Sequence, residues 1–384
     1  MRLFLVFLFL IGLHTQIGLE ILGNWVPNVI SFISGSALLL LNLSRVRKDH
    51  IFLFLSLIFL VILSMFFAPS PFEFALTRII ALLQFIYTLV SAYGVYLELI
   101  GRKKEELFKI FNTILILMIT LATVEVFTPL KVVTIYFAEN YFSTDASLES
   151  IRNYNFSLSY RPFLFTSEPS HVAKTFIVLL ICVLLLRITI TNFIYTSALS
   201  LYLIFLTGSF SMAFILVFMF AIYMLYQSGK SIKIRQNIFL TISIILLAFI
   251  ISPYLFLNAF SVRLDELVLG NDASSNLRLY GSLIVGWEVA QLYPITGAGL
   301  GGLDAIEQDV IKILLGLGTP IYFLENWDLL MVNGIGSIFL SFGLIFAVPF
   351  LIICYLLFKS ISNGDGFINL LFFAIFCFLM GNIY

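Results

Sequence analysis

The sequence predicts an all-α fold, a polytopic transmembrane helical bundle that forms one integral-membrane domain over residues 1–384. Three observations lead to this class. The chain is 61% hydrophobic and 11% charged, whereas soluble domains are about a quarter charged. Apolar runs near the length of a membrane-spanning helix, about 20 residues, recur along the whole chain. Basic residues gather in the short gaps between these runs.

The apolar runs predict about eleven spans. The start of the chain resembles a signal peptide, but no small-x-small cleavage site follows, so we expect a retained first span. The tenth run contains Gly334, Gly336, Gly343 and Pro349, which predict a tilt or a kink. The runs cover about 3–22, 26–43, 51–67, 75–99, 107–128, 171–187, 190–207, 209–227, 237–260, 329–358 and 367–384.

Basic residues follow every even-numbered span, so their five clusters fall on one side of the membrane if every span is real. Lysine and arginine in short loops mark the cytoplasmic side. We therefore expect a cytoplasmic N-terminus and two large external loops, about 129–170 and 261–328. The clusters are Arg45, Arg47 and Lys48; Arg102, Lys103 and Lys104; Arg187; Lys230, Lys233 and Arg235; and Lys359.

Composition disfavours several classes of function. The formal net charge is zero and no basic block occurs, so we expect no nucleic-acid partner. The three cysteines lie inside apolar runs and the three histidines are scattered, so we expect no disulfide framework, no metal site and no cofactor. No pair of matching interrupted spans recurs in two halves, which weakens an interpretation as an inverted-repeat transporter.

The second external loop contains a predicted amphipathic helix, 275–292. Tyr280, Ile284 and Trp287 recur at spacings of four and three, which favours one apolar stripe on a helix at the membrane interface. Tyr280 is a candidate substrate contact. A further apolar piece, 310–324, is short and broken by glycine and proline, so we expect it to be re-entrant or interfacial.

The stretch Tyr160–Lys174 brings Arg161, Glu168, His171 and Lys174 together within fifteen residues of a mostly apolar chain. Its residues Glu168, His171 and the following Thr175 lie at i, i+3 and i+7, which places them on one helix face. Arg161 precedes a proline and is biased to an extended backbone. Alone, Glu168 is explained as a helix-start residue and His171 as an interfacial one. Their co-occurrence with Arg161 favours a catalytic site.

Two arginines of the second external loop are further candidates. Arg278 occupies the first turn of the predicted interfacial helix, and a helix N-terminus with an arginine is a good anion cradle. Arg263 is a weaker candidate for substrate binding, because Asp265 and Glu266 follow closely and favour a plain surface ion pair.

A glycine-rich turn, 294–302, follows the interfacial helix. Glycines allow the backbone to approach a ligand closely, so Gly297 and Gly299 are candidate substrate contacts. The turn is not a P-loop, because no Gly-Lys-Ser/Thr sequence follows.

Three charged residues lie near the predicted outer ends of spans: Arg78, Glu20 and Glu125. Ionisable groups within a membrane usually face a cavity or pair with one another. The alternative is that each side chain reaches the headgroup region, or snorkels. We take Arg78 as a candidate substrate-binding residue and assign no role to Glu98 and Lys109.

Three stretches resemble motifs of the O-antigen polymerase and O-antigen ligase superfamily. They are an arginine followed by Glu-Pro in 161–173, a serine-containing start of a span in 206–212, and an arginine helix that ends in a Pro-x-x-Gly-x-Gly-x-Gly turn in 277–301. The chain departs from the family where Phe163 and Leu164 replace a frequent glycine, and where Phe210 replaces a frequent arginine.

The resemblance implies a GT-C-type architecture and a glycosyltransferase of the bacterial plasma (inner) membrane. Such an enzyme polymerises repeat units linked to a polyprenyl (undecaprenyl) pyrophosphate into lipopolysaccharide O-antigen, capsule or exopolysaccharide at the periplasmic face. Arg161 and Arg278 would bind the pyrophosphate without a metal, and Glu168, or else His171, would serve as base. The implied partners are the lipid-linked glycan, membrane lipid and a possible chain-length regulator.

Rival interpretations stay open at this point. A ligase would use the same arginines and transfer the glycan to a lipid A core or a protein. A polysaccharide or lipid transporter, or flippase, would place its charges at mid-membrane and show repeat symmetry. A membrane scaffold without catalytic activity is a third alternative.

Overall fold

The computed structural model describes residues 1–21, 24–26, 28–142, 161–166, 169–207, 219, 223, 281–319, 324, 327 and 334–362. The chain divides into two compact units, and each is described by itself. The first comprises Met1–Gly35 and Glu98–Asp265, and the second comprises Ser36–Leu97 and Glu266–Tyr384.

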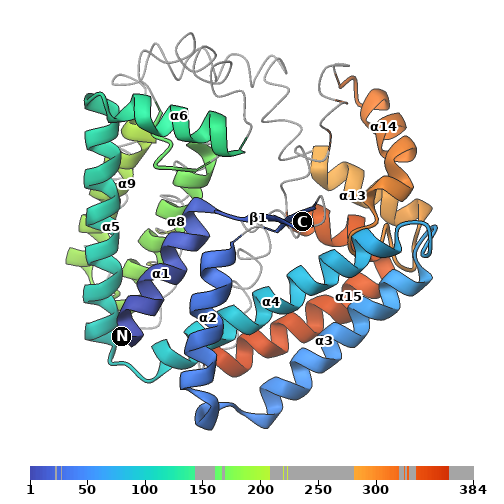
Figure 1. The fold of residues 1–384 in the computed structure, drawn as a ribbon, viewed down its shortest axis with the longest axis horizontal. Helices are drawn as coiled ribbons and strands as arrows, with labels where there is room; N and C mark the ends of the chain where they lie inside the picture. The colour runs from blue at the N-terminus through green and yellow to red at the C-terminus, as the bar shows by residue number, and fades with distance from the viewer. Residues whose placement is uncertain are drawn as a thin grey trace, which may run out of the picture. The chain divides into compact units, whose positions relative to one another are not determined.

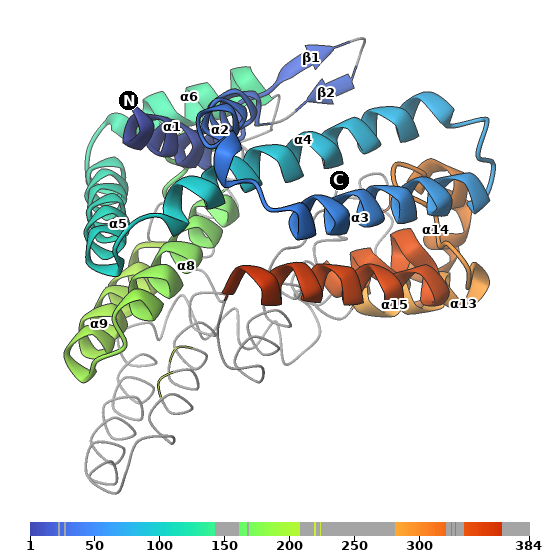
Figure 2. The ribbon, with the colours of Figure 1, turned by 90° about the horizontal axis from the view of Figure 1, so that it is seen from below.

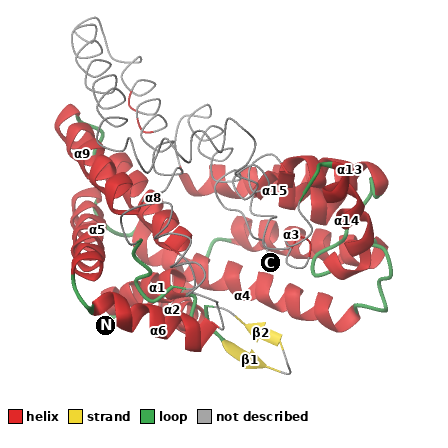
Figure 3. Ribbon diagram, turned by 90° about the horizontal axis from the view of Figure 1, so that it is seen from above, coloured by secondary structure: helices red, strands yellow, loops and turns green. Residues whose placement is uncertain are grey.

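The described elements are helical apart from one short antiparallel hairpin (Figures 1 and 3). In chain order they are α1 (Arg2–Thr15), β1 (Leu19–Ile21), β2 (Asn24–Val26), α2 (Val29–Leu41), the 3-10 turn η1 (Leu43–Arg45), α3 (Lys48–Phe67), α4 (Ala75–Ile100), α5 (Lys104–Phe127), α6 (Leu130–Phe142), α8 (Pro169–Leu186), α9 (Ile190–Thr207), α13 (Ser282–Leu292), the 3-10 turn η3 (Leu303–Ile306), α14 (Glu307–Gly316) and α15 (Gly334–Ser362).

Five described helices are long and apolar enough to cross a membrane: α3, α4, α5, α9 and α15. They confirm that the predicted spans 51–67, 75–99, 107–128, 190–207 and 329–358 are helical, with bounds that agree to within about five residues over the described part of the chain. The predicted span 171–187 coincides with α8, and 26–43 contains α2. The predicted spans 209–227, 237–260 and 367–384 lie outside the described residues, apart from two helical positions, Met219 and Tyr223.

The predicted first span, 3–22, is wrong in its second half. Helix α1 ends at Thr15, where the next residue, Gln16, adopts φ 53° and ends the helix in a left-handed conformation. The chain then enters the β1–β2 hairpin, in which Leu19 pairs with Val26. At about 1.5 Å per residue, a helix of 14 residues reaches roughly 21 Å, which is shorter than a hydrocarbon core of about 30 Å.

In the first unit, α8 packs against α5 and α9 and also contacts α1, and all four helices contribute buried apolar side chains. Helix α1 lies close to the first turn of α2, because Gly12 leaves space for Ser31, whose hydroxyl donates to the carbonyl oxygen of Phe9 at 2.9 Å. Between α9 and α5, the hydroxyl of Tyr195 donates to the side-chain oxygen of Asn112 at 2.9 Å. Polar contacts between helices therefore supplement the apolar packing.

In the second unit, α3, α4 and α15 run alongside one another (Figures 1 and 2). Leu57 and Val61 of α3 pack in one cluster with Phe342 and Phe350 of α15. Phe342 and Phe350 also stack on each other, with ring centroids 4.3 Å apart.

The structure confirms the predicted helix 275–292 over Ser282–Leu292, which form α13. One side of α13 packs directly against α15. Gly286 of α13 faces Gly336 of α15 so closely that a Cβ atom on either residue would overlap the partner backbone. The buried face is made of small and β-branched residues such as Val285, whereas Ile284 and Trp287 of the predicted stripe are 39% and 47% exposed. The predicted stripe is thus on an exposed side of α13, and the contact of a different side with α15 was not predicted.

Two further loop segments are helical. The first external loop begins with α6, which the sequence did not predict. The piece 310–324 overlaps α14, a helix of ten residues that ends at Gly316, and this confirms that it is too short to span.

Candidate active site

A short turn, residues 161–166, carries the arginine that the sequence singled out. Arg161 is half-buried, and its Nε–H donates to the carbonyl oxygen of Thr207 at 2.7 Å. Thr207 is the last residue of α9, and carbonyl groups at a helix C-terminus lack helical partners and carry partial negative charge. The guanidinium therefore caps α9, and it joins the start of the 161–173 stretch to the 206–212 stretch.

The backbone of this turn is strained. Leu164 and Phe165 adopt φ values of 44° and 63°, a left-handed conformation that costs a residue with a side chain about 1–2 kcal/mol. Thr166 closes the turn, because its backbone N–H and its hydroxyl both donate to the carbonyl oxygen of Phe163, at 2.9 and 2.6 Å. Two adjacent strained residues persist only where surrounding contacts hold them.

Glu125 of α5 provides the first of these contacts. Its side chain is fully buried, and its two oxygens accept backbone N–H groups of the turn: Oε1 from Phe163 and Oε2 from Leu164, both at 2.8 Å. The hydroxyl of Thr134, from α6, also donates to Oε1 at 2.7 Å. The carboxylate of Glu125 is therefore hydrogen-bonded inside the protein and does not reach the headgroup region. Its hydrogen bonds connect α5 to α6 and to the turn.

His14 of α1 provides the second contact. Its Nε2 lies 3.1 Å from the carbonyl oxygen of Leu164, which can only accept, so Nε2 carries a proton. Its Nδ1 lies 3.0 Å from the hydroxyl of Thr175, one turn beyond the half-buried His171 on α8. The sequence analysis considered the scattered histidines, His14 among them, only as metal ligands and assigned His14 no role. The available signal was an ionisable residue inside an apolar helix, which usually has a partner.

Among the residues that the sequence placed in the catalytic site, the structure locates Arg161 and His171 in the first unit. Glu168, Arg263, Arg278 and Tyr280 lie outside the described residues. The expected convergence of Arg161, Glu168 and Arg278 therefore stays a prediction. Among the described residues, no cluster of three or more His, Cys, Asp or Glu side chains could hold a metal ion.

Arg78 occupies a second notable place, in the second unit. It is 2% exposed, so it does not snorkel to the headgroup region. Its Nη1 donates to the carbonyl oxygen of Ala298 at 2.9 Å, and its Nη2 to that of Pro69 at 2.7 Å. Its buried Nε–H has no hydrogen-bond partner within the described part of the chain. One guanidinium thus joins the start of α4 to the glycine-rich turn.

The glycine-rich turn closes around this guanidinium. A Cβ atom at Gly299 would overlap Nη1 of Arg78, and one at Gly302 would lie 2.5 Å from Nη2. Gly297 and Gly299 also adopt φ values of 57° and 73°, which favour glycine. The sequence predicted that a ligand would approach these glycines closely. In the structure, the guanidinium of Arg78 and the backbone of α15 approach them. A contact of these glycines with substrate stays a prediction.

Helix α15 is interrupted where the turn meets it, and Gly343 adopts φ 61° at the break. The carbonyl of Pro294 accepts the N–H groups of Leu344 and Ile345, both at 2.9 Å. In return, the N–H of Ala298 donates to Leu340 at 2.8 Å. An interrupted helix within a membrane requires such partners, because no water is present to replace them. The predicted kink in this span is therefore a break at Gly343, and the inserted turn satisfies its backbone groups.

The long apolar helices, the buried charges and the interrupted α15 fit the class of multi-pass helical membrane proteins. No protein-family model, curated protein or solved structure matches the chain.

Proposed function

We propose that this chain is a glycosyltransferase of a bacterial plasma membrane that polymerises oligosaccharide repeat units carried on a polyprenyl pyrophosphate. The contact between Arg161 and Thr207 carries the proposal. It joins the first two of the three stretches that resemble the polymerase superfamily, and it fixes the guanidinium of the half-buried Arg161 at the end of α9.

The conformation of Leu164 supports the same proposal. Members of the superfamily often have a glycine in this part of the motif, and Leu164 adopts φ 44° here, in the left-handed region that glycine enters without strain. The chain retains the backbone shape that the glycine would favour. Glu125 and His14 supply hydrogen bonds that compensate for the strain.

In the proposed reaction, a sugar hydroxyl of one lipid-linked glycan attacks the anomeric carbon of another. The bond from that carbon to the pyrophosphate oxygen breaks, and the pyrophosphate leaves with the bonding electrons. Glu168 accepts the proton of the attacking hydroxyl, with His171 as the second candidate. Arg161, with Arg278 as its expected partner, stabilises the growing charge on the leaving group through guanidinium hydrogen bonds.

The interrupted helix favours a second candidate function, a flippase or transporter. Secondary transporters often bind substrate at discontinuous helices, and α15 is broken at Gly343, where it meets the glycine-rich turn that also contacts the buried Arg78. The ligase alternative differs from a polymerase only in its acceptor.

A deletion strain complemented with variants tests these functions. We expect Arg161→Ala to lower polymer formation about 100- to 1000-fold, which is typical of losing a donor aimed at developing charge, and Glu168→Gln to lower it as well. Arg187→Ala is the matched control, because Arg187 is exposed and directly follows α8, and its guanidinium lies over the ring of Phe108 at 5.6 Å. Membrane levels and thermal stability are measured in parallel.

The glycan products separate the candidates. Loss of a polymerase leaves single repeat units at the outer face, loss of a ligase leaves lipid-linked polymer, and loss of a flippase leaves repeat units on the cytoplasmic face. Normal chain lengths from Arg161→Ala, with normal protein levels, would contradict the assignment of Arg161.

A further inference from the structure

Helix α6 and the turn at 161–166 line a groove of about 300 Å³ in the first unit. Most of its lining side chains are aromatic, and they come from two separate segments of the chain. This volume is at the lower end of the range of small-molecule sites, about 300–1,000 Å³, so the groove suits a small part of a larger ligand. Its lining residues are Val133, Tyr136, Phe137, Asn140 and Tyr141 of α6 and Phe165 of the turn.

The aromatic rings of the groove pack against one another in a defined arrangement. Phe137 stacks on Tyr141, with ring centroids 5.2 Å apart and ring planes 7° apart. Phe165 meets Phe137 edge-on, with centroids 5.5 Å apart and planes at 80°. Phe165 also adopts φ 63°, and strained backbone is frequent where a protein holds a ligand. The left-handed turn thus brings a ring from outside α6 against the rings of α6.

Hydrogen-bonding groups accompany these rings. Tyr136 is 67% exposed, and its hydroxyl can both donate and accept. Nδ2 of Asn140 donates to the carbonyl oxygen of Tyr136 at 2.7 Å, which holds the amide group on the same face of α6. A sugar ring has C–H groups on its faces and hydroxyl groups at its edge. The C–H groups are attracted to the negative face of an aromatic ring, and the hydroxyl groups pair with an amide or a phenol. The groove therefore complements a sugar.

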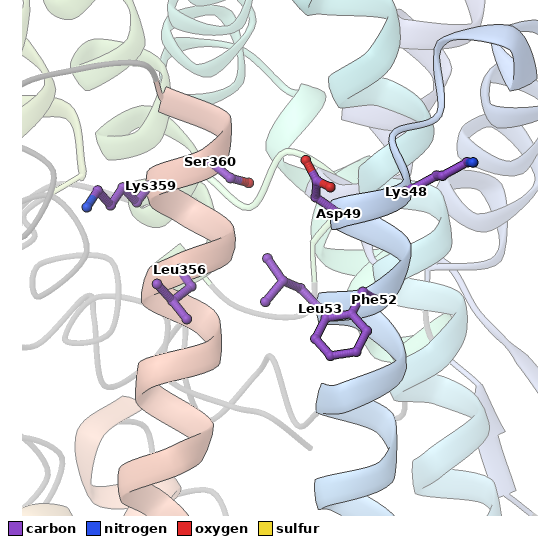
Figure 4. Close-up of a pocket in the computed structure, with 7 residues that line it drawn as sticks. All are labelled: Lys48, Asp49, Phe52, Leu53, Leu356, Lys359 and Ser360. Carbon is purple, nitrogen blue, oxygen red and sulfur yellow. The ribbon is translucent and has the colours of Figure 1, made fainter.

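A larger groove in the second unit lacks this combination. It has a volume of about 690 Å³ and lies between the start of α3 and the end of α15 (Figure 4). Among its described lining residues only Phe52 is aromatic. The ammonium groups of Lys48 and Lys359 point away from the gap, as Figure 4 shows. Of the two grooves, the one beside α6 therefore has the lining that matches a sugar.

We propose that the groove between α6 and Phe165 binds sugar rings of the lipid-linked glycan. The proposal rests on the proposed function, because it places the glycan near the arginine that is expected to bind its pyrophosphate. Arg161 and Phe165 are four residues apart in one turn, so their Cα atoms lie within about 14 Å of each other. A short oligosaccharide attached to the pyrophosphate covers this distance.

Kinetics of the purified full chain in detergent, with lipid-linked repeat units extracted from the deletion strain as substrate, test the proposal. We expect Tyr136→Ala to raise KM about 3- to 10-fold, the range of one ring-packing contact, with little change in kcat. Tyr136→Phe keeps the ring and should recover most of this loss. Arg161→Ala should instead lower kcat, because its guanidinium is expected to act on the charge of the leaving group.

The matched control is Phe127→Ala, because Phe127 is 66% exposed, belongs to the same unit and does not line the groove. An equal rise in KM for Tyr136→Ala and Phe127→Ala would overturn the proposal in favour of general aromatic anchoring at the membrane interface. Polyprenyl pyrophosphate without a glycan should inhibit Tyr136→Ala and the wild type equally. Weaker inhibition of the variant would show that the groove holds the isoprenoid chain, and it would also overturn the proposal.

Two further outcomes separate this proposal from the proposed function. An active wild type with an unchanged KM for Tyr136→Ala would overturn the glycan groove and leave the proposed function intact. A wild type that forms no polymer from these repeat units would contradict the proposed function itself, and the glycan groove with it.

Discussion

The carboxylate of Glu125 accepts the backbone N–H of Leu164 at 2.8 Å, although Leu164 holds a left-handed conformation that disfavours any residue with a side chain. A fully buried glutamate in an apolar helix thus stabilises the strained turn that follows Arg161 and Pro162. The backbone N–H groups of the turn gain an acceptor. The buried carboxylate gains hydrogen-bond donors, without which its burial would be costly. We regard Glu125 as a positioning residue for Arg161.

Replacing Glu125 by glutamine should destabilise the protein by about 2–5 kcal/mol. Glutamine offers one acceptor oxygen, and its amide group would point donors at an N–H group, so at least one buried N–H of the turn loses its partner. Thermal unfolding in detergent measures the change. Glu105→Gln, at an exposed position in the first turn of the same helix, should have little effect. Equal melting temperatures for Glu125→Gln and the wild type would refute the role of Glu125.

Two glycines with the same backbone conformation should respond differently to alanine. Gly299 and Gly318 adopt φ values of 73° and 74°, but a Cβ at Gly299 would overlap Arg78, whereas no atom of the described residues lies within 4 Å of one at Gly318. Gly318→Ala should cost about 1 kcal/mol, from backbone strain alone. Gly299→Ala should cost a further 1–3 kcal/mol or so, from overpacking. Equal destabilisation of the two variants, measured by chemical unfolding, would show that Arg78 does not fill the turn.

Arg78→Lys should destabilise the second unit by about 1.5–3 kcal/mol. The guanidinium reaches the carbonyls of Ala298 and Pro69 with two different nitrogens, and a single ammonium group cannot reproduce this fork. One carbonyl would then lose a charged donor. The control is Arg45→Lys, because Arg45 is exposed and makes a longer contact, 3.4 Å, to the carbonyl of Leu97. A difference below about 0.5 kcal/mol between the two variants would contradict the prediction.

The contact between Tyr293 and Asp309 should make stability depend on pH. The hydroxyl of Tyr293 donates to Asp309 at 2.7 Å, and this hydrogen bond, followed by that from Lys312, lowers the pKa of Asp309 below its ordinary value of 3.8. The same bond raises the pKa of Tyr293 above 10.0.

The two shifts act at opposite ends of the pH range. A lowered carboxyl pKa contributes stability that is present above pH 3.8 and is lost as the pH falls through the folded value. A raised phenol pKa contributes stability that is present below pH 10.0 and is lost as the pH rises through the folded value. Asp309 is 32% exposed, so we expect a contribution of at most about 1 kcal/mol. Tyr293→Phe should reduce both losses, and unchanged pH profiles of unfolding would count against the contact.

Local pattern was sufficient for the membrane class and for most of the described helices. Apolar runs of the right length predicted α3, α4, α5 and α9 closely, because in a membrane nearly every residue of a span must be apolar whatever it packs against. Pattern was insufficient at α1, whose apolar run continues past Thr15 while the backbone turns into a hairpin. It also gave no sign of the contact between α13 and α15, because Gly286 meets Gly336 only when two helices come together.

The sequence marked Arg78 and Glu125 as unusual, since a charge is costly in an apolar helix wherever it lies, and it marked Arg161 by its place beside Glu168 and His171. Their partners were decided by tertiary structure. Glu125 binds a turn 38 residues away, and Arg78 binds a carbonyl 220 residues away. These partners are backbone groups freed by a strained turn and by a glycine-rich turn that enters the break in α15. Any residue type can supply a backbone N–H or C=O, so the sequence carries no mark of these contacts until folding leaves a particular group without a partner.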